Sequence, residues 1–351
     1  MASPKRGTST KKGEDPSYNE LRRELAAGSA GSLYVFHGEE TYLRDRSLEA
    51  LKELLLTGGL DDFNYHAISG KDFTLSRLHE TVNAIPMMSE RTLVVVTDWD
   101  MDKGDREGLI ELLGDLPDYV CLVFVYDTIE YKPDNRSKLA KLVKEKGKVV
   151  NFARQDSKKL MRWIDARFQA LGHEISDGDA DYLISRCGDL MTGLISEIEK
   201  IGAYTKRRQV TRQDIDAVTT PQLDAVIFNL TDAIAVKNFD RSFHILGDLL
   251  HMQEPPIGIL AALAKQVRKL YTARLAVEEG KDVRWFMELW ALRWSFQAEK
   301  LYEAARRFSL EWYHWALLRC EEADVRLKST GADGQEVLVE LLLEMAQHQG
   351  P

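Results

Sequence analysis

The chain has 351 residues, and protein domains commonly have about 150 residues, so its length indicates two or three domains. Hydrophobic residues make up 44% and charged residues 29%, a balance typical of folded globular proteins, which excludes a disordered chain. Lysine and arginine number 47 against 56 aspartate and glutamate residues, and the formal net charge of −9 excludes a protein that coats DNA or RNA through overall positive charge. No apolar run reaches the roughly 18 residues of a membrane-spanning helix, so we expect no membrane segment and a cytoplasmic protein.

The N-terminal residues are basic. Lys5, Arg6, Lys11 and Lys12 are not followed by an apolar segment, so the pattern does not fit a secretory signal. We expect a flexible basic tail over residues 1–30. Contact of this tail with a phosphate backbone stays open, because short basic ends of acidic proteins are usually solvated.

Strand-like and helix-like segments alternate between residues 31 and 154. The runs rich in β-branched and aromatic residues are 33–36, 63–68, 92–97, 120–126 and 148–152. The segments with helical periodicity are 41–56, 74–85, 103–113 and 134–146. This alternation is typical of a parallel sheet with helices on both faces, and it predicts an α/β domain.

After residue 155 no strand-like run of comparable quality follows. Proline is absent from residues 134–220 and 257–350, so long stretches can form uninterrupted helix. We predict a small helical domain over 155–221 and a helical bundle over 222–346. Two helix starts in the first of these carry a hydroxyl with an acid three residues later, at Ser176 and Asp179 and at Thr211 and Asp214.

The turn after the first predicted strand stands where a phosphate-binding loop would lie. Such a loop reads G-x-x-x-x-G-K-[ST], because backbone amides wrap the phosphates while lysine and a hydroxyl reach the terminal phosphate and Mg²⁺. Aligned on Gly38, this chain has Leu43, Arg44 and Asp45 where Gly, Lys and Ser/Thr should stand. Asp45 would place negative charge beside the phosphates. We expect nucleotide binding here to be lost or very weak, and a plain turn with no history of nucleotide binding is the alternative interpretation.

Other catalytic signatures do not occur in the sequence. Asp98 and Asp100 follow the predicted strand at 92–97, like acids at the end of a metal-holding strand, but without a phosphate loop we interpret them as solvated turn residues. Neither HExxH nor GxSxG is present, and the eight histidines show no paired metal-ligand spacing. The three cysteines lie far apart without CxxC spacing, which favours buried reduced thiols. We therefore expect no catalytic group, no metal and no cofactor.

A short apolar segment, Ile85-Pro86-Met87-Met88, lies in a predicted loop just before the strand at 92–97. In one interpretation, which the residues alone favour, both methionines fill a gap between helix and sheet. In the other, they form an apolar peg that enters a pocket on another protein, for which flexible thioether side chains are suited.

Five of the seven tryptophans gather in the last third of the chain, at Trp285, Trp290, Trp294, Trp312 and Trp315. Trp290 and Trp294 are four residues apart and Trp312 and Trp315 three apart, which predicts that each pair packs from one helix face. Stacking on single-stranded nucleic acid is the alternative.

The same region contains two basic clusters, Lys265, Arg268 and Lys269, and Arg306 and Arg307. They could reach phosphate, but clusters of this kind are usually solvated helix faces.

Five stretches in the same order resemble the delta subunit of the bacterial DNA polymerase III clamp loader. The first, FHGEETYL at 36–43, matches a turn of the form hydrophobic-G-x-E-x-x-L, and the second is AIPMMSERTLVVV at 84–96. The resemblance spans about residues 31 to 346. The other three stretches are 188–204, 230–250 and 320–343.

The resemblance implies an AAA+-like α/β domain over 31–154 with a degenerate nucleotide-binding loop, an all-α lid over 155–221 and an all-α collar for oligomerisation over 222–346. It implies that Met87 and Met88 enter a hydrophobic pocket of the ring-shaped sliding clamp, where other members often have leucine and phenylalanine. The chain would then hold one clamp interface open so that the ring can be loaded on primed DNA during replication.

The implied partners are the sliding clamp (beta subunit) and the delta-prime and tau/gamma subunits of a hetero-pentamer, with primed DNA bound by the complex. ATP would be bound by partner subunits, and this chain would hold no cofactor. It would belong to the DNA-directed DNA polymerase III holoenzyme, a nucleotidyltransferase, without catalysis of its own, in the bacterial cytoplasm at the nucleoid-associated replisome. A divergent P-loop ATPase and a helical nucleic-acid-binding scaffold are the alternatives, and the altered loop and the net charge argue against them.

Overall fold

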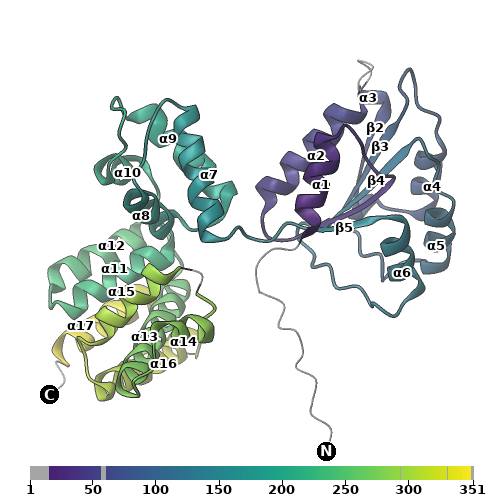
Figure 1. Cartoon of the computed structure of the whole chain (residues 1–351). Helices are drawn as coiled ribbons and strands as arrows, with labels where there is room; N and C mark the ends of the chain where they lie inside the picture. The colour runs from purple at the N-terminus through teal and green to yellow at the C-terminus, as the bar shows by residue number, and fades with distance from the viewer. Residues whose placement is uncertain (1–15, 57–60, 293, 330, 349–351) are drawn as a thin grey trace, which may run out of the picture. The chain divides into compact units, whose positions relative to one another are not determined.

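The computed structural model describes residues 16–56, 61–292, 294–329 and 331–348. The chain divides into two compact units (Figure 1). The first extends to Asp156 and includes Leu190–Thr192; the second comprises Ser157–Asp189 and the residues from Gly193 onward. Within the described residues, no helix is both long enough and apolar enough to cross a membrane.

A five-stranded parallel sheet forms the centre of the first unit, with the strand order β2-β3-β4-β1-β5. β3 and β4 are buried along almost their whole length, as expected for strands that are covered on both faces. The α/β prediction is confirmed. The strands are β1 (Leu33–His37), β2 (Tyr65–Ser69), β3 (Thr92–Thr97), β4 (Val120–Val125) and β5 (Lys148–Asn151).

Helices cover both faces of this sheet (Figure 1). One face carries α1 (Pro16–Ala26) and α2 (Thr41–Leu55), and the other carries α4 (Leu75–Asn83), α5 (Arg106–Gly114) and α6 (Lys138–Lys146). The short helix α3 (Asp61–Asn64) leads into β2, and the 3₁₀ turn η1 (Gly70–Asp72) follows it. The strand-like run at 63–68 therefore begins as helix, and its first two residues were wrongly predicted. Val35, Leu78, Val94, Leu109 and Leu122 belong to the core between the sheet and α4–α6.

Helix α1 lies where the sequence predicted a flexible tail, and that prediction is wrong for residues 16–26. Leu21 is fully buried, and the Tyr18 ring lies 5.6 Å from the ring of Phe152. The Ser17 hydroxyl accepts a hydrogen bond of 3.0 Å from the Asn151 backbone amide, so α1 is bound to the β5 edge of the sheet. Lys5, Arg6, Lys11 and Lys12 of the predicted tail lie outside the described residues.

The second unit is helical, as predicted. Among its described residues the only bridge between extended segments pairs Glu174 with Gln209. Thr211 and Asp214 form a complete capping box, and the Ser176 side chain accepts the Asp179 amide. The first helices are α7 (Ser157–Ala170), α8 (Asp177–Cys187), α9 (Met191–Tyr204) and α10 (Arg212–Val218). The following helices are α11 (Leu223–Ala235), α12 (Phe239–His251), α13 (Pro256–Glu278), α14 (Val283–Leu289), α15 (Ser295–Ala305), α16 (Leu310–Ser329) and α17 (Gly334–Gln347).

The predictions for the two tryptophan pairs have different outcomes. Trp312 and Trp315 share α16, and Trp312 is buried with its ring stacked on Phe308 at 3.7 Å between centroids. Trp290 instead follows the last residue of α14, and Trp294 precedes α15, so the expected common helix face for this pair is wrong. The division of the helical region into lid and collar at residue 221 stays a prediction.

All three cysteines are buried free thiols, as expected: Cys121, Cys187 and Cys320. Burial raises the pKa of the Cys121 thiol to about 12 and that of Cys187 to about 11. These thiols therefore remain protonated near neutral pH and serve as apolar core residues.

Candidate functional site

The predicted site residues lie at opposite ends of the parallel strands. Gly38 and α2 follow β1, whereas the segment 85–88 precedes β3. Because all the strands run parallel, the first group lies at their carboxyl ends and the second at their amino ends. The structure therefore contains two separate candidate sites, one at each end of the sheet.

A close backbone contact explains why position 38 is a glycine. Its φ is +123°, and a Cβ at this position would lie 2.5 Å from the carbonyl oxygen of Phe152. That carbonyl accepts the Glu40 backbone amide at 2.8 Å, while the Phe152 amide donates to the His37 carbonyl at 2.7 Å. The glycine thus lets β1 and the end of β5 pack together, and this contact alone accounts for it.

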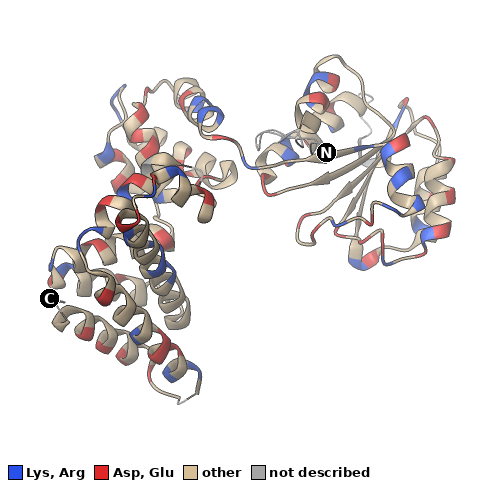
Figure 2. Cartoon of the chain, turned by 60° about the horizontal axis from the view of Figure 1, so that its bottom comes forward, with Lys and Arg blue, Asp and Glu red and all other residues tan. Residues whose placement is uncertain are grey.

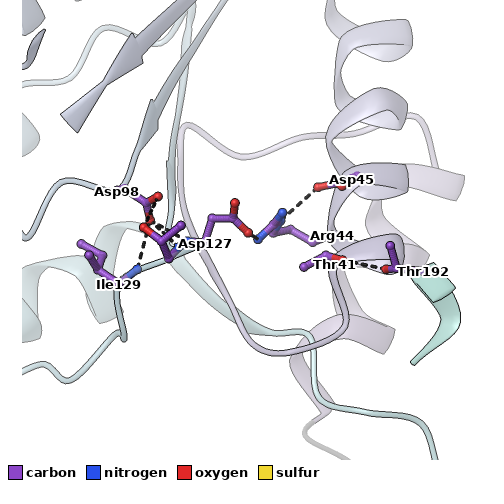
Figure 3. A network of polar contacts seen from close by, with 8 residues as sticks. Thr41, Arg44, Asp45, Asp98, Asp127, Ile129 and Thr192 are labelled. Atoms are coloured by element: carbon purple, nitrogen blue, oxygen red, sulfur yellow. Dashed lines mark hydrogen bonds and ion pairs between the residues drawn. The ribbon is translucent and has the colours of Figure 1, made fainter. Parts of the chain in front are cut away.

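Arg44 occupies the position of the phosphate-binding lysine, and its charge is already paired. The buried guanidinium donates from Nη1 to Asp127 at 2.6 Å and from Nε to Asp45 at 3.0 Å (Figure 3). Burial lowers the pKa of Arg44, but the hydrogen bonds and charges of Asp127 and Asp45 outweigh it and leave that pKa raised. Leu43, where the second glycine would stand, is buried on the inner face of α2.

Asp98, at the end of β3, is bound to the segment that follows β4. Its carboxylate accepts the backbone amides of Asp127 at 2.8 Å and Thr128 at 2.9 Å and the Thr128 hydroxyl at 2.7 Å (Figure 3). Burial raises the pKa of Asp98, but these hydrogen bonds outweigh it and hold the pKa below its usual value. Asp98 therefore joins the ends of two neighbouring strands, a structural role that we did not expect of a solvated turn residue. Asp100 forms a partly exposed ion pair with Lys103.

The start of α2 carries a buried acidic side chain. Glu40 is fully buried, and its carboxylate accepts the Met191 amide, which belongs to the same unit, at 3.2 and 3.3 Å. The hydroxyls of Thr41 and Thr192 lie 2.7 Å apart beside it (Figure 3). A buried carboxylate at a helix N-terminus stands where a phosphate-binding site would need room and positive potential.

The loop between α4 and β3 presents apolar side chains to solvent. Ile85 is 85% exposed, Met88 80% and Met87 52%. The interpretation that both methionines fill a gap in the core is therefore wrong. Phe63, just before β2, is 56% exposed at the same end of the sheet. Grouped exposed apolar side chains are unusual on a soluble surface and typically mark an interaction site.

This loop is held by specific hydrogen bonds. The buried side chain of Asn64 donates from Nδ2 to the Met87 carbonyl and accepts the Met87 amide at Oδ1, both at 2.8 Å. Farther along, Arg91 donates to the carbonyls of Gly31 at 3.0 Å and Val120 at 3.1 Å. Met88 has a φ of +53°, in the left-handed region that residues with a β-carbon rarely adopt. Sequence reasoning missed Asn64, because its contact joins residues 23 positions apart.

The basic clusters of the second unit lie among acids. Lys265 pairs with Asp224 at 2.8 Å, and Arg307 pairs with Asp232. Figure 2 shows basic and acidic residues interspersed along these helices. This mixture agrees with solvated helix faces for Lys265 and Arg307, whereas Lys269 is half-buried and burial lowers its pKa.

Comparisons with known proteins cover both units. Residues 34–153 match the family model described as DNA polymerase III, delta subunit, and residues 224–345 match that of the C-terminal domain of the same subunit. "DNA polymerase III subunit delta" of Bacillus subtilis is 23% identical over 329 residues, covering 92% of this chain and 94% of that protein. "Probable DNA polymerase III subunit delta" of Aquifex aeolicus is 22% identical, covering 90% of this chain and 92% of that protein.

A solved structure has a similar fold. The clamp loader delta protein of Bacillus subtilis superposes with a TM-score of 0.58 and 21% identity, covering 94% of this chain and 99% of that one. The fold is thus an AAA+-like α/β unit followed by a helical unit. With both family models matched in chain order, the chain belongs to the DNA polymerase III delta subunits, components of the clamp loader.

Proposed function

We propose that this chain is the clamp-loader subunit that binds the sliding clamp through the apolar loop 85–88 and holds one interface of the ring open. The observation that carries the proposal is the exposure of Met87 and Met88 on a loop whose backbone is fixed by buried hydrogen bonds. Unbranched thioether side chains adapt well to a hydrophobic pocket, so methionine can replace the leucine and phenylalanine common in the family.

Opening a ring requires more than adhesion. A ligand shifts an equilibrium only by the difference between its affinities for the two states, so the loop must bind the open clamp more tightly than the closed one. A loop anchored on a rigid sheet can transmit such a preference, since the Met87 backbone is tied to α3 and the Arg91 side chain is tied to the Val120 carbonyl of the sheet.

The same proposal assigns no catalysis and no ATP to this chain. In its support, Arg44 is neutralised by Asp127 and Asp45, and the buried carboxylate of Glu40 lies at the helix N-terminus. ATP is bound instead by the tau/gamma subunits, which form a hetero-pentamer with delta-prime and this chain and act on primed DNA.

The experiment uses the sliding clamp of the same organism, loaded on nicked circular DNA. The purified chain should accelerate loss of the clamp from the circle without ATP, and the Met87→Ala/Met88→Ala variant should not. Met252→Ala is the matched control, because Met252 is also exposed, at 61%, but lies at the end of α12. Equal clamp release by wild type and double variant would contradict the proposal.

A further inference from the structure

We infer that Asn64 is a positioning residue for clamp binding, whose buried amide keeps the loop in the conformation that presents Met87 and Met88 to the partner. The inference rests on the proposed function. It assigns a role to a residue that does not itself reach the surface, since Asn64 is 2% exposed.

The geometry of the contact fixes the loop in two ways. Asn64 ends α3 and uses both functional atoms of its amide on one backbone unit, accepting from the Met87 amide and donating to the Met87 carbonyl, each at 2.8 Å. Two hydrogen bonds to the same residue restrain its rotation as well as its position. Donor and acceptor on one short neutral side chain are a property of asparagine, and neither aspartate nor alanine offers both.

The adjoining backbone needs such a restraint. Met88 has a φ of +53°, a conformation that disfavours residues with a β-carbon, so an unrestrained loop would populate other conformations. Beyond it, the Ser89 hydroxyl donates to the Arg91 carbonyl at 3.1 Å, which restrains the far side of the loop. Asn64 supplies the restraint on the near side.

Preorganisation has a characteristic effect on binding. When only a fraction of the free protein has a binding-competent loop, the apparent dissociation constant rises by the inverse of that fraction. The association rate falls in proportion, whereas the dissociation rate of the complex changes less, because the partner then holds the loop. Loss of a contacting side chain acts in the opposite way and mainly raises the dissociation rate.

The experiment is a double-mutant cycle on the full chain, with the sliding clamp of the same organism as the probe. It compares wild type, Asn64→Ala, Met87→Ala/Met88→Ala and the combined variant by surface-plasmon kinetics. We expect Asn64→Ala to weaken binding about tenfold, mostly through slower association. In the background without the methionines, the same change should have little further effect.

Two further variants separate positioning from a general loss of structure. Asn83→Ala is the matched control, because Asn83 ends α4 next to the loop but its side-chain amide donates only to His79 of its own helix, at 2.8 Å. Asn64→Asp keeps the size and the acceptor but sets a carboxylate against the Met87 carbonyl, so it should bind as weakly as Asn64→Ala. The midpoint of thermal unfolding and the stoichiometry of binding report whether each variant is folded, and hydrogen exchange at the Met87 amide should speed up in both Asn64 variants.

The outcomes are distinguishable. If the methionine variant loses binding while Asn64→Ala and Asn64→Asp bind like wild type, the positioning role is overturned and the proposed function stands. If Asn64→Ala weakens binding equally with and without the methionines, Asn64 does not act through the loop, and the inference fails. If the methionine variant binds like wild type, the proposed function fails, and this inference fails with it.

Discussion

The guanidinium of Arg44 and the carboxylate of Asp127 lie 2.6 Å apart, although they are 83 positions apart in the chain. The ion pair joins α2 to the segment after β4, at the carboxyl ends of the strands, where open parallel sheets commonly bind their ligands. A cation that would otherwise attract phosphate is thus used within the domain.

The pair predicts that Arg44→Ala lowers stability without changing ATP binding. Removing a buried cation leaves Asp127 without its partner, but Asp127 is 41% exposed, so the cost should be about 1–2 kcal/mol, less than for a fully buried pair. Urea unfolding measures this, with Arg46→Ala, an exposed arginine of the same helix, as the control. Micromolar ATP binding that disappears in Arg44→Ala would favour the divergent ATPase instead.

Asp98 predicts a pH dependence of stability. Its pKa in the folded protein is depressed, so its carboxylate adds stability above the unfolded-state pKa of about 3.9, and this contribution is lost as pH falls through the lower folded-state pKa. An asparagine side chain at this position would keep an acceptor for the amides of 127 and 128 and tolerate the positive φ of 56°. The Asp98→Asn variant should therefore be less stable than wild type at pH 7. The difference in their free energies of unfolding should become smaller below about pH 4. An equal difference in free energy of unfolding at pH 7 and at pH 3 would contradict a stabilising role for the Asp98 carboxylate.

Gly38→Ala should be strongly destabilising. The new Cβ would lie 2.5 Å from the Phe152 carbonyl oxygen on a backbone with φ of +123°, and crowding with backbone strain should cost about 3 kcal/mol. Gly114→Ala is the control, because a Cβ there meets nothing within 4 Å at the end of α5. Equal unfolding midpoints for the two variants would show that Gly38 is not needed for the contact with Phe152.

Helix α1 should contribute to the stability of the first unit. Leu21→Ala removes a fully buried side chain and should lower the free energy of unfolding by about 2–5 kcal/mol. Arg22→Ala, on the exposed side of the same helix, should change it by less than about 0.5 kcal/mol. Similar values for both variants would mean that α1 is not docked in solution.

Much of the sheet was predictable, because β3 and β4 are continuous apolar runs that only a doubly covered strand accommodates. Helix α1 was missed because most of its residues are polar or charged and only Leu21 is fully buried. Phe63 was assigned to a strand because aromatic residues favour strands, yet the local chain forms α3. Local patterns therefore predicted the elements with strong periodicity. They failed where only one or two buried residues determine the secondary structure of a segment.

The candidate sites were predictable only in part. The template centred on Gly38 showed that the phosphate loop is altered, but the pairing of Arg44 with Asp127 depends on the tertiary fold. Exposure of Met87 and Met88 could not be deduced either, because apolar residues in a loop can face the core or solvent equally well, and the hydrogen bonds from Asn64 to the Met87 backbone depend on the tertiary fold.

The most direct test of the account is the affinity of the purified chain for the sliding clamp of the same organism, compared among wild type, Met87→Ala/Met88→Ala and Met252→Ala. Truncation of buried anchors typically costs about 2 kcal/mol or more, so the double variant should bind at least about 30-fold more weakly, while Met252→Ala binds like wild type. Unchanged affinity in the double variant would contradict clamp binding through this loop, and absence of binding by wild type would contradict clamp binding by this chain altogether.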